Sequence, residues 1–129
     1  ESINKIKVES IKEDIIKNLR LSNSVNTYIG ELEIDLKSIK DLCFMLSDKI
    51  EKLFVIIVSK TDDKVFISCF VSKELVEEKG FNASNIVKEL SPIIDGNGGG
   101  QPFFATAGGK KIDGIKSVLS QSEKIINQI

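Results

Sequence analysis

The chain has 129 residues, of which 41% are hydrophobic and 29% charged, and these values are ordinary for one globular domain with its own core. Its 18 basic and 19 acidic residues give a net charge of -1, which argues against a broad binder of nucleic-acid backbone but permits a local site of uneven charge. The chain contains no histidine, which disfavours zinc ligation and excludes Ser-His and Cys-His nucleophile pairs.

The first element is predicted to be a helix over residues 2–20, because its apolar positions recur with helical spacing. The apolar stripe consists of Ile3, Ile6, Val8, Ile11, Ile15, Ile16 and Leu19. Such a helix is too short to be stable alone. It is expected to pack on the domain itself, on a preceding coil of a longer parent or on a second copy, and the pattern leaves core packing and self-association equally open.

A strand is predicted within residues 25–36, whose second half alternates between apolar and polar positions. Ser38 is the expected N-cap of a following helix, which carries Leu42, Cys43, Leu46 and Ile50 on one face. The uninterrupted apolar run at 54–58 is typical of a strand covered on both sides. A turn at 61–64 and a strand at 65–71 complete a predicted hairpin, in which Asp62 and Asp63 are interpreted as solvated turn residues.

A short helix, a longer helix and a terminal helix are predicted in the second half of the chain. One begins at Ser72 and ends at Gly80, and the next is capped by Asn82 or Ser84. Residues 111–129 show the stripe of an amphipathic helix. Strands and helices alternate, so we predict an α/β fold with a single mixed sheet covered by helices and preceded by an N-terminal amphipathic helix. Residues 1–24 are predicted to be the N-terminal helical segment and 25–129 the globular domain.

The segment between these helices is rich in glycine. Residues 95–109 contain six of the nine glycines of the chain, around an apolar run of strand length at 103–107. Glycine lets backbone N-H groups approach a partner closely, and successive N-H groups form concave anion sites. The spacing fits neither a P-loop nor a dinucleotide-binding turn. We therefore predict an ordered glycine loop that binds an anionic group, in preference to a mobile linker.

The glycine-rich run has a counterpart in a known family. Residues 98–109 read GGGQPFFATAGG and resemble the glycine-rich signature of the C-terminal domain of alanyl-tRNA synthetase, a domain type also attached to DHH-family phosphoesterases. The segments SIKDL at 38–42, LVEEKGFNA at 75–83 and IVKEL at 86–90 resemble the same domain in the same order. The likeness covers most of the chain from about residue 25 to residue 129.

This resemblance implies a non-catalytic tRNA-binding domain that contacts the tRNA elbow and links aminoacylation with editing. Its expected partners are alanine tRNA, other domains of the parent synthetase and, as an option, a second copy in a homodimer. ATP, magnesium and zinc are expected only in other domains of the parent, and no cofactor in this segment. Gln101 stands where many members carry Arg, so the bidentate phosphate contact of a guanidinium is absent here.

The predicted RNA-binding residues lie in and just after the glycine run. Backbone donors come from glycines, hydrogen-bonding side chains from Asn, Gln and Thr, base stacking from Phe and phosphate contacts from Lys. The set comprises Asn97, Gly98, Gly99, Gly100, Gln101, Phe103, Thr106, Gly108, Gly109, Lys110 and Lys111. Alternation predicts that only one of Phe103 and Phe104 is exposed.

Two other functions stay open. The terminal stripes at 3–19 and 112–129 suit an oligomerisation module, in which the glycines serve only close packing. The domain type also suits the nucleotide-binding part of a DHH-type phosphoesterase.

Cellular placement and redox state are predicted from what the sequence contains. Cys43 and Cys69 are expected to be buried reduced thiols. The sequence shows neither a membrane-length apolar span nor a signal-peptide layout, which predicts a cytoplasmic protein without membrane contact. The chain begins with Glu1, which suggests a piece of a larger parent.

Overall fold

The computed structural model describes residues 2–22, 24–60 and 63–128, with the side chains of residues 2–8 and 22 excepted. The turn residues Thr61 and Asp62, the terminal Ile129 and the side chains of the first three positions of the N-terminal stripe therefore lie outside the described part. Asp63, the second residue of the predicted acidic turn, is exposed.

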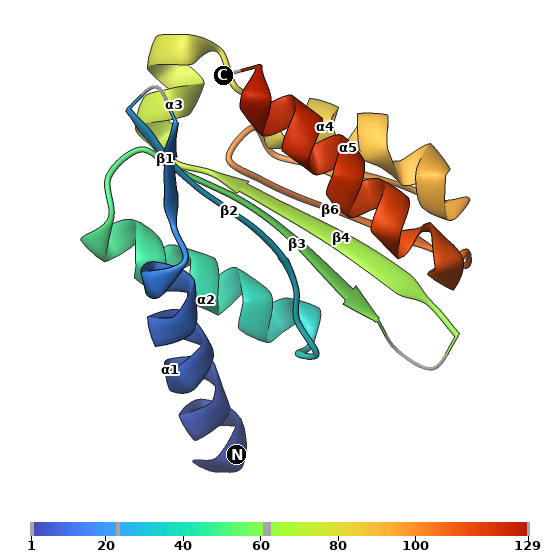
Figure 1. The fold of residues 1–129 in the computed structure, drawn as a ribbon, viewed down its shortest axis with the longest axis horizontal. Coiled ribbons are helices and arrows are strands. Elements are labelled where there is room, and N and C mark those ends of the chain that lie inside the picture. The colour runs from blue at the N-terminus through green and yellow to red at the C-terminus, as the bar shows by residue number, and fades with distance from the viewer. Residues whose placement is uncertain (1, 23, 61–62, 129) are drawn as a thin grey trace.

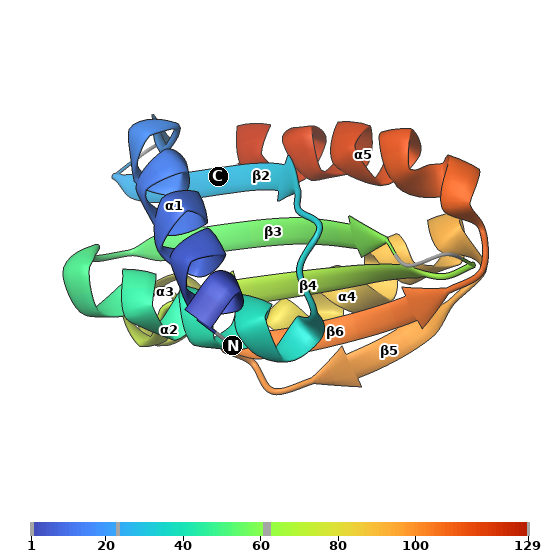
Figure 2. The same cartoon turned by 90° about the horizontal axis from the view of Figure 1, so that it is seen from below.

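In the described residues, six strands form one mixed sheet in the order β1-β2-β3-β4-β6-β5. Figure 2 shows the order from β2 to β5. Their bounds are β1 Arg20–Ser22, β2 Val25–Glu31, β3 Leu53–Lys60, β4 Val65–Val71, β5 Asn97–Gly100 and β6 Phe104–Gly109. β2 and β3 are parallel, and every other neighbouring pair is antiparallel. The predicted mixed sheet and the hairpin of β3 and β4 are thus confirmed.

Helices cover both faces of this sheet (Figure 1). The helices are α1 Ser2–Lys17, α2 Leu36–Lys49, α3 Lys73–Lys79, α4 Ala83–Leu90 and α5 Ile115–Asn127, with short 3-10 turns at Ser91–Ile94 and Ile112–Gly114. The first two pack on one face, while α3, α4 and α5 pack on the other. The prediction of a helix-covered sheet is confirmed.

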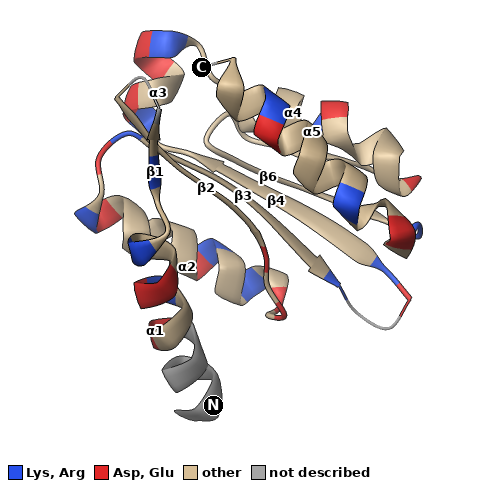
Figure 3. Ribbon diagram, in the orientation of Figure 1, with Lys and Arg blue, Asp and Glu red and all other residues tan. Residues whose placement is uncertain are grey.

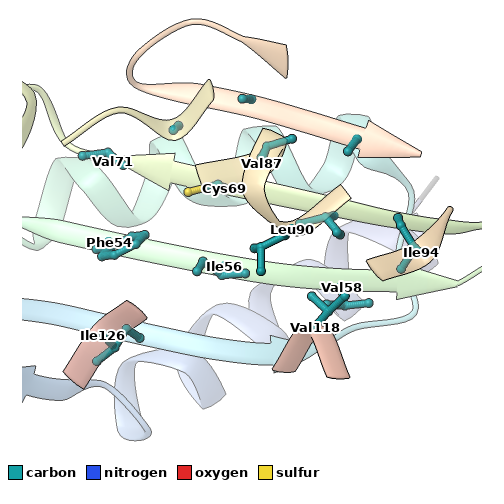
Figure 4. Packing of buried hydrophobic residues seen from close by; sticks show 14 of the residues in the cluster. Phe54, Ile56, Val58, Cys69, Val71, Val87, Leu90, Ile94, Val118 and Ile126 are labelled. Atoms are coloured by element: carbon teal, nitrogen blue, oxygen red, sulfur yellow. The ribbon is translucent and has the colours of Figure 1, made fainter. Parts of the chain in front are cut away.

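β3 shows why the sheet needs both helical layers. Its first seven residues are all buried, and they divide by alternation between two cores. Phe54, Ile56 and Val58 face α4 and α5 (Figure 4), whereas Val55 and Ile57 face α1 and α2. Burying a side chain of this size contributes about 1.5–3 kcal/mol.

The connection from β2 to α2 differs from the prediction. α2 begins at Leu36 after Asp35 as N-cap, so Ser38 lies inside the first turn and its hydroxyl donates to Asp35 Oδ1 at 2.6 Å. This hydrogen bond lowers the pKa of the Asp35 carboxyl. Leu32 and Ile34, which suggested a longer strand, belong to a connector packed on the α1 and α2 core. Because only one side of this connector is buried, its apolar and polar residues alternate as they would in a strand.

The predicted C-terminal end of α3 and the predicted N-cap of α4 are confirmed. Gly80 adopts the left-handed conformation at φ 70°, which ends α3 and which favours glycine. Asn82 caps α4 by accepting a hydrogen bond from the Asn85 N-H at 3.1 Å. The terminal helix begins later than predicted, at Ile115, because residues 112–114 form a 3-10 turn.

Both terminal helices contribute to the domain's own core. Ile15 of α1 is buried with the α2 cluster, and α5 buries Ile115, Val118 and Ile126 against the opposite face. An ion pair between Arg20 on β1 and Glu123 on α5 links the first strand to the terminal helix. Among the described residues, no helix combines the length and the apolar character that crossing a membrane requires.

Cys43 and Cys69 are free and buried, as predicted. Burial raises the pKa of the Cys43 thiol from its ordinary 9.0 to about 12, and it also raises the pKa of Cys69. We expect neither thiol to react with iodoacetamide at pH 8 in the native chain, while both react in denaturant, because the thiolate is the nucleophile. Mass spectrometry of timed samples measures this, and rapid native labelling of Cys43 would contradict the buried packing.

Candidate nucleic-acid interface

The glycine run forms a strand, which corrects the predicted loop. β5 pairs with β6 at the edge of the sheet, with Gly98 opposite Ala107 and Gly99 opposite Thr106. In an antiparallel pair, only alternate N-H groups face away from the partner. Consecutive glycine amides of β5 therefore do not converge on one anion, as the prediction of a concave loop required.

Close packing explains several of the glycines. An added Cβ at Gly98 would lie 2.2 Å from the Thr106 carbonyl oxygen, and one at Gly96 would lie 2.2 Å from the Gly108 oxygen. At Gly109 the obstacle is the carbonyl oxygen of Ile94, also at 2.2 Å, which accepts hydrogen bonds from the Lys110 and Lys111 N-H groups at 3.1 Å. These glycines hold β5, β6 and the turn after α4 in direct backbone contact.

A hollow of about 410 Å³, here called the hairpin hollow, lies where β4 begins and β6 ends. It is lined by Lys64, Phe66, Asp95, Gly96, Asn97, Gly108, Gly109 and Lys110. Phe66 is half-buried opposite Gly108, where an added Cβ would meet its ring at 3.2 Å, so glycine leaves room for the ring. Two lysines thus flank a wall of backbone and one aromatic ring.

A smaller hollow of about 180 Å³, here called the turn hollow, lies at the opposite end of the hairpin that β5 and β6 form. Its lining consists of Lys40, Gly99, Gly100, Gln101, Phe103, Phe104, Ala105 and Thr106. The Gln101 N-H donates to the Phe104 carbonyl at 2.9 Å and closes the turn. Lys40 on α2 places its Nζ 5.9 Å from the centre of the Phe104 ring, within cation-π range.

Local charge is positive although the chain is nearly neutral. The two hollows together present Lys40, Lys64 and Lys110 but only one carboxylate, that of Asp95. β5 and β6 carry no charged residue, whereas the helices carry both acidic and basic residues (Figure 3). A phosphate-bearing ligand fits lysines that stand over uncharged backbone, since Lys donates three hydrogen bonds to such groups.

Most of the predicted residues line the two hollows. Asn97, Gly108, Gly109 and Lys110 line the hairpin hollow, and Gly99, Gly100, Gln101, Phe103 and Thr106 line the turn hollow. Gly98 and Lys111 line neither of them. Phe103 is exposed and Phe104 half-buried, which confirms that the two rings differ in exposure.

Seven residues that line these hollows are absent from the predicted set, namely Lys40, Lys64, Phe66, Asp95, Gly96, Phe104 and Ala105. Lys64 and Phe66 reach the hairpin hollow because β4 pairs with β6, and Lys40 reaches the turn hollow from α2. The sequence contains one pattern from which the orientation of Phe66 could have been predicted. Its position in β4 alternates with the core residues Val65 and Ile67, so it had to face the other side of the sheet.

Comparisons with known proteins agree with this fold. The family described as the DHHA1 domain matches residues 21–128. Over 126 residues the chain is 42% identical to the alanine-tRNA ligase of Christiangramia forsetii, covering 98% of this chain and 14% of the ligase. The chain thus spans about 14% of the length of that curated relative.

Solved structures show the same architecture. The C-Ala domain of Aquifex aeolicus alanyl-tRNA synthetase is 25% identical, with a TM-score of 0.73 over 84% of this chain and 97% of that one. A DHH-domain protein described as a member of a family of ribosomal proteins has a TM-score of 0.57 at 17% identity, over 95% of this chain and 31% of that protein, and shares the fold alone. The family resemblance found in the sequence is confirmed.

Proposed function

Because the chain belongs to the DHHA1 domain family and has the fold of the C-Ala domain, we propose that it is the tRNA-binding C-terminal domain of an alanine-tRNA ligase. In this proposal, it acts in the cytoplasm, holds alanine tRNA at the elbow and couples aminoacylation with editing in the parent. The observation that carries RNA binding is the hairpin hollow, where Lys64 and Lys110 flank exposed glycine backbone.

The geometry suits recognition of a folded RNA better than non-specific electrostatic attraction to any nucleic acid. With a net charge of -1, the chain lacks the general positive field that draws a protein to any phosphate backbone. Lysines at both ends of the hairpin instead mark a narrow contact zone, with ring and backbone surfaces between them. Such a zone recognises a folded RNA by its shape and by a few phosphates.

The chemical steps are assigned to other parts of the parent. Among the described residues, no three His, Cys, Asp or Glu side chains come together to hold a metal ion. Both thiols are buried and so cannot meet a substrate. We propose that ATP, magnesium and zinc bind in other domains, and that this domain contributes affinity and placement of the tRNA.

The described residues of the terminal helices offer the competing oligomerisation function little exposed apolar surface. Ile115, Val118 and Ile126 of α5 and Ile15 of α1 are buried in the domain's own core, and Leu119 and Ile125 are partly buried against it. Among the large apolar side chains described on these two helices, only that of Ile16 is exposed, at 40%. For the phosphoesterase alternative, the likeness to a DHH-domain protein extends to the fold alone.

A titration with two forms of alanine tRNA tests the proposal. We expect the 129-residue chain to bind folded alanine tRNA more tightly than the same RNA with a disrupted elbow, and to lose affinity as salt rises from about 50 to 200 mM because bound phosphates release counterions. Filter binding or fluorescence anisotropy measures both effects. Equal affinity for the two RNAs would contradict elbow recognition, and no binding to either would contradict the tRNA-binding function.

A further inference from the structure

An aromatic cluster extends the turn hollow across the sheet toward α3. Phe44 of α2 meets Phe70 of β4 with ring centres 5.5 Å apart and planes at 78°, and it meets Phe103 at 6.3 Å and 61°. Phe70 is buried, but Phe44 and Phe103 are 40% and 39% exposed. The two rings are half of the four large apolar side chains that the described residues expose.

These rings line a hollow of about 300 Å³ that is different from the two already described. Its walls are Phe44, Ser47, Phe70, Val71, Lys73 and Phe103, and we call it the aromatic hollow. Phe103 also lines the turn hollow, so the two are adjacent. Together they present Lys40 and Lys73 and no carboxylate, in a chain whose acidic residues outnumber its basic ones.

The backbone holds Phe103 in place. The Val71 N-H donates to the Phe103 carbonyl, and the Ala83 N-H donates to the carbonyl of the preceding Pro102, both at 2.8 Å. The ring is therefore presented from a fixed main chain, with one exposed side. A ring that is already ordered loses little entropy when it binds a ligand.

We propose that the aromatic hollow is a stacking subsite for an unpaired nucleobase of bound RNA, with Lys40 and Lys73 beside the phosphates that flank this base. The inference rests on the proposed tRNA-binding function and adds Phe44 and Lys73 to the interface. A base has the flat face that an aromatic wall requires, and its phosphates match the rim of lysines. An apolar protein partner would use the rings but not this excess of positive charge.

Fluorescence of a base analogue tests the subsite directly. The probe is an alanine tRNA transcript with 2-aminopurine at one unpaired elbow position at a time, mixed with the 129-residue chain. We expect quenching at one or two positions and its loss in Phe44→Leu and Phe103→Leu, which keep an apolar side chain but remove the ring. Affinity should fall about tenfold in each variant, in line with the usual contribution of one base stacked on an aromatic ring.

Leu21→Ala is the matched control, because Leu21 is 72% exposed on β1 at the opposite edge of the sheet. Thermal melting verifies that all variants fold. Normal tRNA affinity with no quenching, and no effect of either Phe substitution, would overturn the subsite while leaving the proposed function intact. Absence of RNA binding would overturn both, and a dimer dispersed by Phe103→Asp would assign the rings to self-association instead.

Discussion

Replacing Gly98 by alanine is expected to separate β5 from β6 and to cost about 1–3 kcal/mol of folding free energy, the usual range for an overpacked site. The added methyl would lie 2.2 Å from the Thr106 carbonyl oxygen and 2.4 Å from the Ala107 Cα. These are backbone atoms of a strand paired on both sides, so they cannot move away as a flexible side chain can. Denaturant unfolding measures the cost, and hydrogen exchange of the β5 and β6 amides locates it.

Gly99→Ala is the matched control, one residue away in the same strand. Its methyl would meet only Lys88 Cε at 3.4 Å and Ser84 Oγ at 3.5 Å, which is ordinary contact with side chains. We expect little change in stability. Because residues of the hairpin line both hollows, Gly98→Ala should also weaken tRNA binding, whereas Gly99→Ala should bind tRNA normally, since its methyl would meet α4 side chains that line neither hollow. Equal destabilisation by the two substitutions would contradict the packing argument.

Local sequence signals predicted most elements of the fold. Gly80 and Asn82 act within one turn of their own positions, so their roles at helix ends could be predicted without knowledge of the sheet. β3 and β4 were predicted from their apolar composition and from the turn between them. The connector at 32–35 was mistaken for strand because burial on one side gives the same alternation whether or not a partner strand is present.

β5 could not be predicted because its extended conformation comes from tertiary pairing. Glycine is depleted in strands, so a run of glycine indicates a loop when read alone. Here the absence of Cβ atoms at Gly96 and Gly98 lets the backbone lie against β6, and this neighbour becomes known only from the strand order. The same lack of strand order hid Lys64 and Phe66, which β4 brings to the end of β6.

Removing both lysines of the hairpin hollow should produce the largest loss of RNA affinity. We expect Lys64→Ala with Lys110→Ala to weaken binding of alanine tRNA by roughly tenfold or more, and to reduce the slope of log affinity against log salt by about two, since each Lys-phosphate contact contributes about one to that slope. Both side chains are exposed and outside the core, so folding stability should stay unchanged. Affinities at several salt concentrations between about 50 and 200 mM give the slope.

The double variant Lys116→Ala with Lys124→Ala removes the same charge from α5, whose buried side packs on the opposite face of the sheet. If affinity depended only on net charge, both double variants would weaken binding equally. If the hairpin hollow holds phosphates, only Lys64→Ala with Lys110→Ala will change the slope of log affinity against log salt by about two. Counterions are released only where a phosphate is bound. Since the chain has a net charge of -1, a difference between the slopes of the two double variants would indicate a local phosphate-binding site and not general electrostatic attraction. Equal slopes would mean that the tRNA binds elsewhere.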